Sequence, residues 1–363
     1  MIYCGKILIL VMEVVIMKQK TIEDYGINIG SFKKGKLNKI TDVEGVRVGH
    51  CTIDDNEHKT GVTVVMPSED NIFLNKLPCA VHVINGFGKT LGTIQVEELG
   101  TLETPIAITN TLNVGLVHDS IVEYMLKLCK NDNHEFTSIN PIVCECNDGY
   151  LNKIDDRAVK QEHVFKAIED ACEDFLQGDI GAGKGTSCHN LKGGIGSASR
   201  IVELGDNEYT VGMIVQSNYG RLEDLTIDGK NIGKELSEKI NINATVDKGS
   251  IIMIIATDIP LSTRQLKRAA KRASVGLSRV GSYIGHGSGD VVICFSTANA
   301  VKHEEQNDFV SYSAINENKI DKVFRAVAEC CEESILNSMI CSNTTIGYKG
   351  NIRYSLEEVK KLL

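Results

Sequence analysis

The chain has 363 residues and a formal net charge of -9 at pH 7. This acidic balance argues against a general nucleic-acid binder or a protein of anionic membrane surfaces. Its twelve cysteines are spread along the chain, which is typical of reduced thiols in a cytosolic protein rather than of a disulfide framework.

The first twenty residues contain the apolar run ILILVMEVVI. Glu13 interrupts the run, no small-residue cleavage site follows it, and it is too short to span a bilayer. We therefore expect residues 1–20 to form a disordered leader, and residues 21–363 to form a single folded domain. A membrane anchor is not expected.

Short β-rich runs follow, separated by longer segments with helical patterns. Several of these runs are apolar at every position, which is typical of strands covered on both faces at the centre of a layered sandwich. The expected strands are 46–50, 61–67, 78–84, 105–109, 140–146, 209–216, 250–256 and 290–296.

Three segments have clear helical periods. Apolar residues recur at intervals of three and four over 159–176, and Gly178 is placed to end that helix. A second helix is expected to begin at Ser262, with Gln265 completing a capping box. Its basic residues lie opposite the apolar stripe, so we expect an outer, solvated helix. A third helix is expected from about 320 to 339. No Pro- or Ser-rich linker divides the chain.

Two motifs resemble a phosphate-binding loop and a zinc site but lack residues that those sites need. The segment GDIGAGKGT lacks the Ser or Thr that a phosphate-binding loop needs after Lys184, and a helix is expected before it rather than after it. Cys144 and Cys146 lack a second ligand pair with zinc spacing, and they are expected to be core thiols. The nine histidines show no metal-ligand spacing. We therefore expect no metal site and no cofactor.

Gly249 and Ser250 join a polar segment to the apolar run SIIMIIAT. A hydroxyl at the mouth of such a strand can attack the preceding carbonyl, which glycine leaves sterically open. Cleavage there would give Ser250 a free α-amine with a pKa of about 7.7–8.0, which suits a general base. Nucleophile and base would then belong to one residue. An ordinary turn before a strand would have the same two residues.

Other polar residues lie at the ends of expected strands. Ser288 and Asp290 share one face and could orient a neighbouring group. Asn218 could donate to an oxyanion or simply close a strand. Glu145 ends an apolar strand, where an unpaired carboxylate would be costly. Its expected partner is the ammonium group of a substrate, although Asp148 competes for that role.

Six segments, taken in order and spacing, resemble the L-aminopeptidase/D-esterase family, which includes the β-aminopeptidases. The resemblance spans about 38–350 and implies an α/β fold, a four-layer αββα sandwich like that of the N-terminal-nucleophile hydrolases but with different strand connectivity. It also implies self-cleavage between Gly249 and Ser250, which gives chains 21–249 and 250–363. The segments are ITNTLNVG, CECNDGYLN, GAGKGTSCHNLKGGIGSASR, VQSNYGR, TDIPLSTRQLKRAAKRASVGLSRVGSY and GHGSGDVVI.

The resemblance also implies roles for the candidate residues. Ser250 is the expected nucleophile, Asn218 the oxyanion donor, and Ser288 and Asp290 lie beside the amine of the nucleophile. Asn147 stands where some members carry an aromatic hydroxyl, so its contribution to substrate binding is open.

The expected enzyme is a cytoplasmic serine aminopeptidase or amidase that acts on small peptides, amides or esters. It is expected to form a homo-oligomer, by analogy a tetramer of two-chain protomers. The alternatives are an ω-amino-amide hydrolase or acyltransferase with similar maturation, and an uncleaved binding scaffold.

Overall fold

The structure of the chain, a computed structural model, describes residues 19–132, 134–135, 137–240 and 249–362. Most of the expected leader therefore lies outside the described residues. Gln19 already belongs to the folded part, since its side chain donates to the carbonyl oxygen of Gln177 at 2.8 Å and accepts from the backbone N–H of Gln177 at 2.9 Å.

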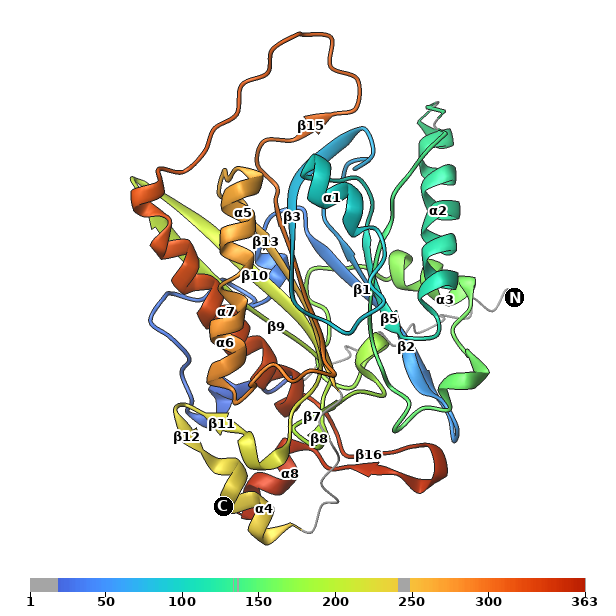
Figure 1. Cartoon of the computed structure of the whole chain (residues 1–363), viewed down its shortest axis with the longest axis vertical. Coiled ribbons are helices and arrows are strands. Elements are labelled where there is room, and N and C mark those ends of the chain that lie inside the picture. The colour runs from blue at the N-terminus through green and yellow to red at the C-terminus, as the bar shows by residue number, and fades with distance from the viewer. Residues whose placement is uncertain (1–18, 133, 136, 241–248, 363) are drawn as a thin grey trace, which may run out of the picture.

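The larger of two main sheets has seven strands, in the order β15-β3-β14-β13-β10-β9, with β4 paired to β3 (Figure 1). Strands β13 and β14 are parallel, and the other pairs are antiparallel. The strands are β3 (Asn75–Gly86), β4 (Thr101–Leu102), β9 (Ile195–Leu204), β10 (Asn207–Asn218), β13 (Ser250–Thr257), β14 (Gly289–Ser296) and β15 (Val301–Lys302).

The smaller main sheet has four strands in the order β1-β2-β5-β6, of which β5 and β6 are parallel. They are β1 (Arg47–Asp54), β2 (Lys59–Met66), β5 (Ile106–Asn110) and β6 (Ile142–Cys146). Short two-stranded pairs complete the chain: β7 (Ser187–Cys188) with β8 (Leu191–Lys192), β11 (Thr226–Ile227) with β12 (Lys230–Asn231), and β16 (Thr345–Ile346) with β17 (Ile352–Arg353).

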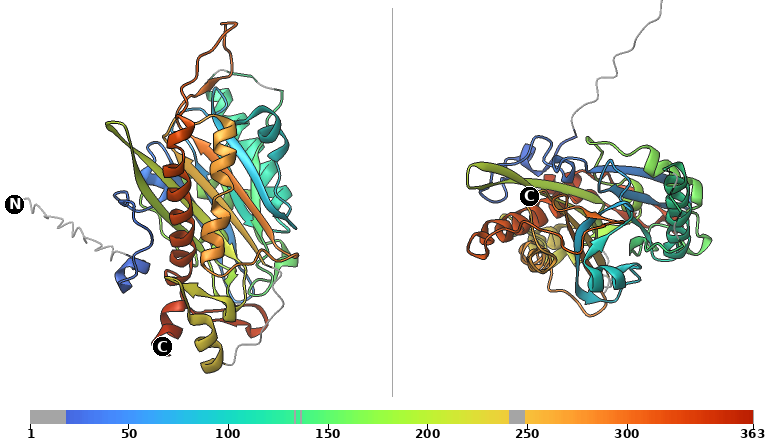
Figure 2. Two further views of the ribbon diagram at one scale, coloured as in Figure 1. Left: turned by 60° about the vertical axis from the view of Figure 1, so that its left-hand side comes forward. Right: turned by 90° about the horizontal axis from the view of Figure 1, so that it is seen from above.

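Helices cover the outer face of each main sheet. Helices α5 (Thr263–Ala270), α6 (Ala273–Arg279) and α7 (Asp321–Ile340) lie on the larger sheet, and α2 (Val114–Asn131) and α3 (Gln161–Glu169) lie on the smaller one (Figure 2). Helix α1 (Thr93–Leu99) contacts β3, whereas α4 (Ile232–Lys239) and α8 (Leu356–Val359) lie near one end of the molecule (Figure 1).

Strand β13 shows why the sequence is apolar at every position from Ile251 to Ala256. Ile251, Met253 and Ile255 pack in the core beneath helices α5, α6 and α7. The alternate residues Ile252 and Ile254 pack in the second core, between the two sheets. A strand with both faces buried cannot show the polar and apolar alternation of a surface strand. The predicted α/β fold with four layers, αββα, is confirmed.

Each predicted strand coincides with an observed one, but two of the predicted helices differ. The helix expected over 159–176 ends at Glu169, because Cys172 instead exchanges backbone hydrogen bonds with Val48 at the edge of β1 (3.1 and 3.0 Å). The helix expected from Ser262 is capped by Ser262 and Gln265 as predicted, but breaks into α5 and α6. Helix α2 and strand β9 were not predicted.

Basic residues of α5, and Arg272 at the start of α6, are paired within the chain. Arg264 and Arg268 both form ion pairs with Glu317, and the guanidinium of Arg272 lies 4.0 Å from the ring centre of Phe324. Cys144 and Cys146 are fully buried, as predicted, and the described cysteines are free thiols. Gly181–Gly183 forms a short 3₁₀ turn with no α-helix directly after it, unlike a phosphate-binding loop.

Candidate active site

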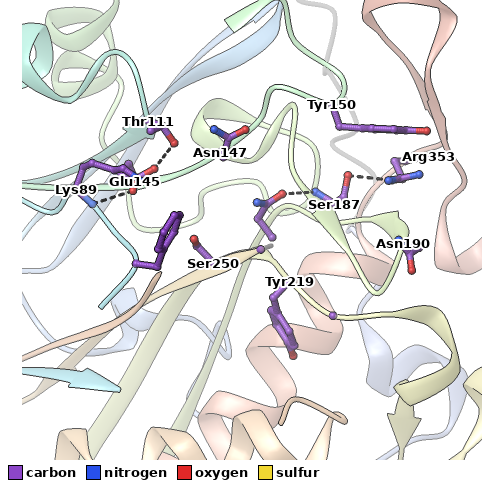
Figure 3. A pocket seen from close by; sticks show the side chains of 14 residues that line it. Lys89, Thr111, Glu145, Asn147, Tyr150, Ser187, Asn190, Tyr219, Ser250 and Arg353 are labelled. Atoms are coloured by element: carbon purple, nitrogen blue, oxygen red, sulfur yellow. Dashed lines mark hydrogen bonds between the residues drawn. The ribbon is translucent and has the colours of Figure 1, made fainter. Parts of the chain in front are cut away.

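A pocket of about 460 Å³ lies where β10 ends and β13 begins. Five of the predicted site residues line it: Glu145, Asn147, Asn218, Gly249 and Ser250. They come from the ends of β6, β10 and β13, so both main sheets contribute to the pocket (Figure 3).

Ser250 is the first residue of β13 and is opposite Asn218, the last residue of β10. Its side-chain oxygen accepts a hydrogen bond from the backbone N–H of Gly289 at 3.1 Å. Gly249 packs tightly, since a Cβ atom added there would lie 2.0 Å from the carbonyl oxygen of Asn218. The chain thus enters β13 through a position that only glycine fits without displacement.

Ser288 and Asp290 lie beside the start of β13, because Asp290 is the register partner of Ile251. The Ser288 hydroxyl donates to Asp290 Oδ2 at 2.7 Å, so the two side chains are in direct contact. Both residues are buried and neither lines the pocket. The pair therefore lies behind the pocket lining, beside the N-terminal end of β13.

Asn85 in β3 holds this pair in position. Its side-chain amide donates to the carbonyl oxygens of Ser288 (2.5 Å) and Gly285 (3.1 Å). The register between β3 and β14 shifts between Asp290 and Val291. Such a bulge redirects side chains, and bulges are frequent beside active sites.

Asn218 has a defined orientation in the pocket. Its Oδ1 accepts a hydrogen bond from the backbone N–H of Ser187 at 2.9 Å. This bond assigns the oxygen, and the opposite arm of the amide is then a donor. Lys192 stabilises the segment before Ser187. Its buried side-chain nitrogen donates hydrogen bonds to the carbonyl oxygens of Gly183 and Thr186 in that segment, and to that of Gly193. Burial lowers the pKa of Lys192 to about 7.

Glu145 is a buried carboxylate, 3% exposed, that lines the pocket. One oxygen accepts from the backbone N–H of Lys89 at 3.0 Å, and the other accepts from the Thr111 hydroxyl. No described Lys, Arg or His forms an ion pair with it; the Lys89 ammonium instead lies 4.7 Å from the ring centre of Phe87. An acidic group of this kind offers a site for a cationic ligand group.

Asn147 and Asp148, two and three residues after Glu145, are placed differently from each other. Asn147 is exposed at the pocket, where its Oδ1 accepts from the backbone N–H of Gly149 at 3.0 Å. Asp148 is 1% exposed and does not line the pocket. Its Oδ1 accepts from the side chain of Asn152 at 2.9 Å, and burial raises the pKa of Asp148 to about 7. The structure therefore separates Asp148 from the proposed substrate site.

Sequence reasoning missed several residues around the pocket. Thr111, Ser187 and Arg353 line it, and Asn85 supports it from β3. Arg353 is more than one hundred residues from Ser250 in the sequence. Thr111 and Ser187 lie inside the segments that carry the family resemblance, which was the one available signal for them.

The described residues contain no cluster of three or more His, Cys, Asp or Glu suited to a metal ion. Nor does any described helix have the length and apolar character needed to cross a membrane.

Comparison with known proteins places the chain in a family. The model of peptidase family S58 matches residues 38–353. The chain belongs to peptidase family S58. This S58 peptidase is 36% identical over 343 residues to "Beta-peptidyl aminopeptidase BapA" of Sphingosinicella microcystinivorans, covering 88% of this chain and 85% of that protein.

Two solved structures share the fold. The PH0078 protein of Pyrococcus horikoshii OT3 has a TM-score of 0.89 and 47% identity, with 94% of this chain and 97% of that chain covered. The L-aminopeptidase D-Ala-esterase/amidase of Ochrobactrum anthropi has a TM-score of 0.87 and 33% identity, with the same coverage of both chains. It is described as a serine aminopeptidase with a variant of the Ntn hydrolase fold. The predictions of family, fold and an aminopeptidase enzyme are confirmed.

Proposed function

We propose that this serine aminopeptidase cuts its own chain between Gly249 and Ser250. The Ser250 hydroxyl would attack the carbonyl carbon of Gly249, and the C–N bond would break as an ester forms and the α-amine of Ser250 is released. Water would then hydrolyse the ester, leaving a carboxylate on Gly249 and a free hydroxyl on Ser250. The tight packing of Gly249 against Asn218 supports this proposal, because it fixes the scissile bond close to the pocket.

In the mature enzyme, the α-amine of Ser250 would take the proton from its own hydroxyl as that oxygen attacks the substrate carbonyl. The side-chain amide of Asn218 would stabilise the oxyanion. The leaving amine would depart with the proton, and water would release the acyl group from Ser250. Ser288 and Asp290 would hold the α-amine in position, and their hydrogen bond beside the start of β13 supports this role.

Glu145 carries the aminopeptidase specificity in this proposal. It is a buried acid in the same pocket as Ser250, without a cationic partner among the described residues, and the N-terminal ammonium of a substrate would supply one. Asn147 would contact the substrate from the exposed rim. We propose that the enzyme releases N-terminal residues from short peptides, amides or esters, a range that the names of its relatives support.

The proposal extends to assembly and compartment. A homo-oligomer of two-chain protomers, by analogy a tetramer, rests on the family resemblance. A cytoplasmic location rests on the free thiols of the described cysteines.

The experiment compares an aminoacyl p-nitroanilide with its N-acetylated form. We expect the wild-type enzyme to hydrolyse only the free-amine substrate, and Ser250→Ala to be inactive. Glu145→Gln keeps the shape and acceptor oxygen but removes the charge, so it should mainly raise KM. Activity in Ser250→Ala, or equal rates on the acetylated substrate, would contradict the proposal.

A further inference from the structure

Arg353 is a buried cation in the same pocket as Ser250. It ends β17 and is 5% exposed. Its Nε donates to the Ser187 hydroxyl at 3.0 Å, and its guanidinium carbon lies 3.6 Å from the ring centre of Tyr150. The stacked ring and this hydrogen bond fix the plane of the guanidinium.

Arg353 forms no ion pair with an acidic side chain among the described residues, unlike the buried cations Arg200 and Lys184. Arg200 forms ion pairs with Glu329 and Glu333, and Lys184 forms them with Asp54 and Asp179. Burial without a carboxylate lowers the pKa of Arg353, although an arginine remains charged near neutral pH. A buried charge without a counter-ion is costly, and the pocket is where a counter-ion can enter.

The position of Arg353 relative to Ser250 identifies which part of a substrate it could meet. Figure 3 shows Glu145, with Lys89 and Thr111, on one side of Ser250 and Arg353, with Tyr150, on the other. The pocket therefore has the Glu145 carboxylate towards one end and the Arg353 guanidinium towards the other, with the nucleophile between them. A peptide has the same arrangement of charges, an ammonium at one end and a carboxylate at the other.

We infer that Arg353 binds the C-terminal carboxylate of a short peptide substrate, on the leaving-group side of the scissile bond. This inference rests on the proposed function, in which Glu145 binds the amine of the residue to be released. The guanidinium keeps N–H groups beyond Nε for a charge-assisted hydrogen bond to a carboxylate oxygen. The preferred substrates are then unblocked short peptides rather than their C-terminal amides.

The test measures kcat/KM for a dipeptide and a tripeptide, each with a free C-terminal carboxylate and as the C-terminal amide. An aminoacyl p-nitroanilide, which has a free amine but no carboxylate, serves as the reference substrate. Purified, fully processed wild-type enzyme is compared with Arg353→Met and Arg353→Lys. Lys89→Met is the matched control, because it removes a cation from the other end of the pocket.

We expect wild-type enzyme to prefer the acid over the amide by about 10- to 100-fold for at least one peptide length. Arg353→Met should abolish that preference while hydrolysis of the anilide continues, and Arg353→Lys should restore part of it. Lys89→Met should leave the acid-to-amide ratio unchanged, whatever its effect on absolute rates.

An acid-to-amide ratio that is the same in wild type and Arg353→Met, for both peptide lengths, would overturn the inference. A ratio that falls equally in Lys89→Met would also overturn it, because the general positive charge of the pocket would then explain the preference. Failure of wild-type enzyme to hydrolyse the anilide is a separate result, and it would count against the proposed function itself.

Discussion

Replacing Gly249 by Ala should slow maturation through a single steric contact. The added methyl group acts through the atoms that surround it. That Cβ would lie 2.0 Å from the carbonyl oxygen of Asn218, whereas real Cβ contacts stay above 3.0 Å. The chain must therefore move by about 1 Å, which in a catalytic geometry costs about 100-fold in rate.

The assay follows the fraction of full-length chain over time by denaturing mass spectrometry, starting from freshly synthesised protein. Gly115→Ala is the matched control, because Gly115 is an exposed residue of α2 with no atom within 4 Å of an added Cβ. We expect the control to mature like wild type and Gly249→Ala to mature about 100-fold more slowly. Equal rates in all three proteins would refute the steric reasoning at this site.

Three further predictions concern the residues around the pocket. Asp290→Asn keeps the side-chain volume but removes the charge that accepts the hydrogen bond of Ser288. In protein confirmed as cleaved, we expect kcat to fall by about 10- to 100-fold with little change in KM. An unchanged kcat across neutral pH would remove Asp290 from the mechanism. EDTA should leave amidase activity intact, since the described residues form no metal-ligand cluster; activity lost to EDTA and restored by zinc or manganese would count against the serine mechanism. Burial raises the pKa of Asp148 to about 7 from an ordinary 3.8. Between these two pH values the folded protein holds a proton that the unfolded chain has released. The free energy of unfolding of the wild type should therefore fall, relative to that of Asp148→Asn, as the pH is raised from about 4 to about 7. The upper limit of that change is about 4 kcal/mol, and parallel stability curves from urea unfolding of the two proteins would contradict it.

The strands at the centre of the fold were predictable because a strand buried on both faces has an uninterrupted run of apolar residues. Strand β13 is apolar from Ile251 to Ala256 because its side chains face both cores, and Ser262 and Gln265 marked the start of α5. The prediction of a helix over 159–176 was wrong beyond Glu169, because a contact with a distant segment leaves no such pattern in the local sequence. The apolar period continues past Glu169 in the sequence. The backbone of Cys172 nevertheless pairs with the edge of β1, a segment more than one hundred residues away, and the helix ends before it.

The candidate site was predictable where polar residues end apolar strands. Ser288 and Asp290 are two residues apart where β14 begins, and this spacing predicted that their side chains point the same way, consistent with the hydrogen bond between them. Glu145 and Asp148 are close in the sequence, yet only Glu145 lines the pocket. The Glu145 carboxylate contacts Lys89 and Thr111, whereas that of Asp148 contacts Asn152 away from the pocket. Arg353 carried no local signal. Its place beside Ser187 and Tyr150 depends on how distant segments pack.

The central claim is that Ser250 becomes an N-terminal nucleophile. The most direct test is denaturing mass spectrometry of active enzyme, quenched during turnover of a slowly hydrolysed ester. We expect two fragments, with the smaller one covering residues 250–363, and the acyl mass increment on that smaller fragment alone. An active enzyme that remains one chain, or an acyl group on any residue other than Ser250, would contradict the account.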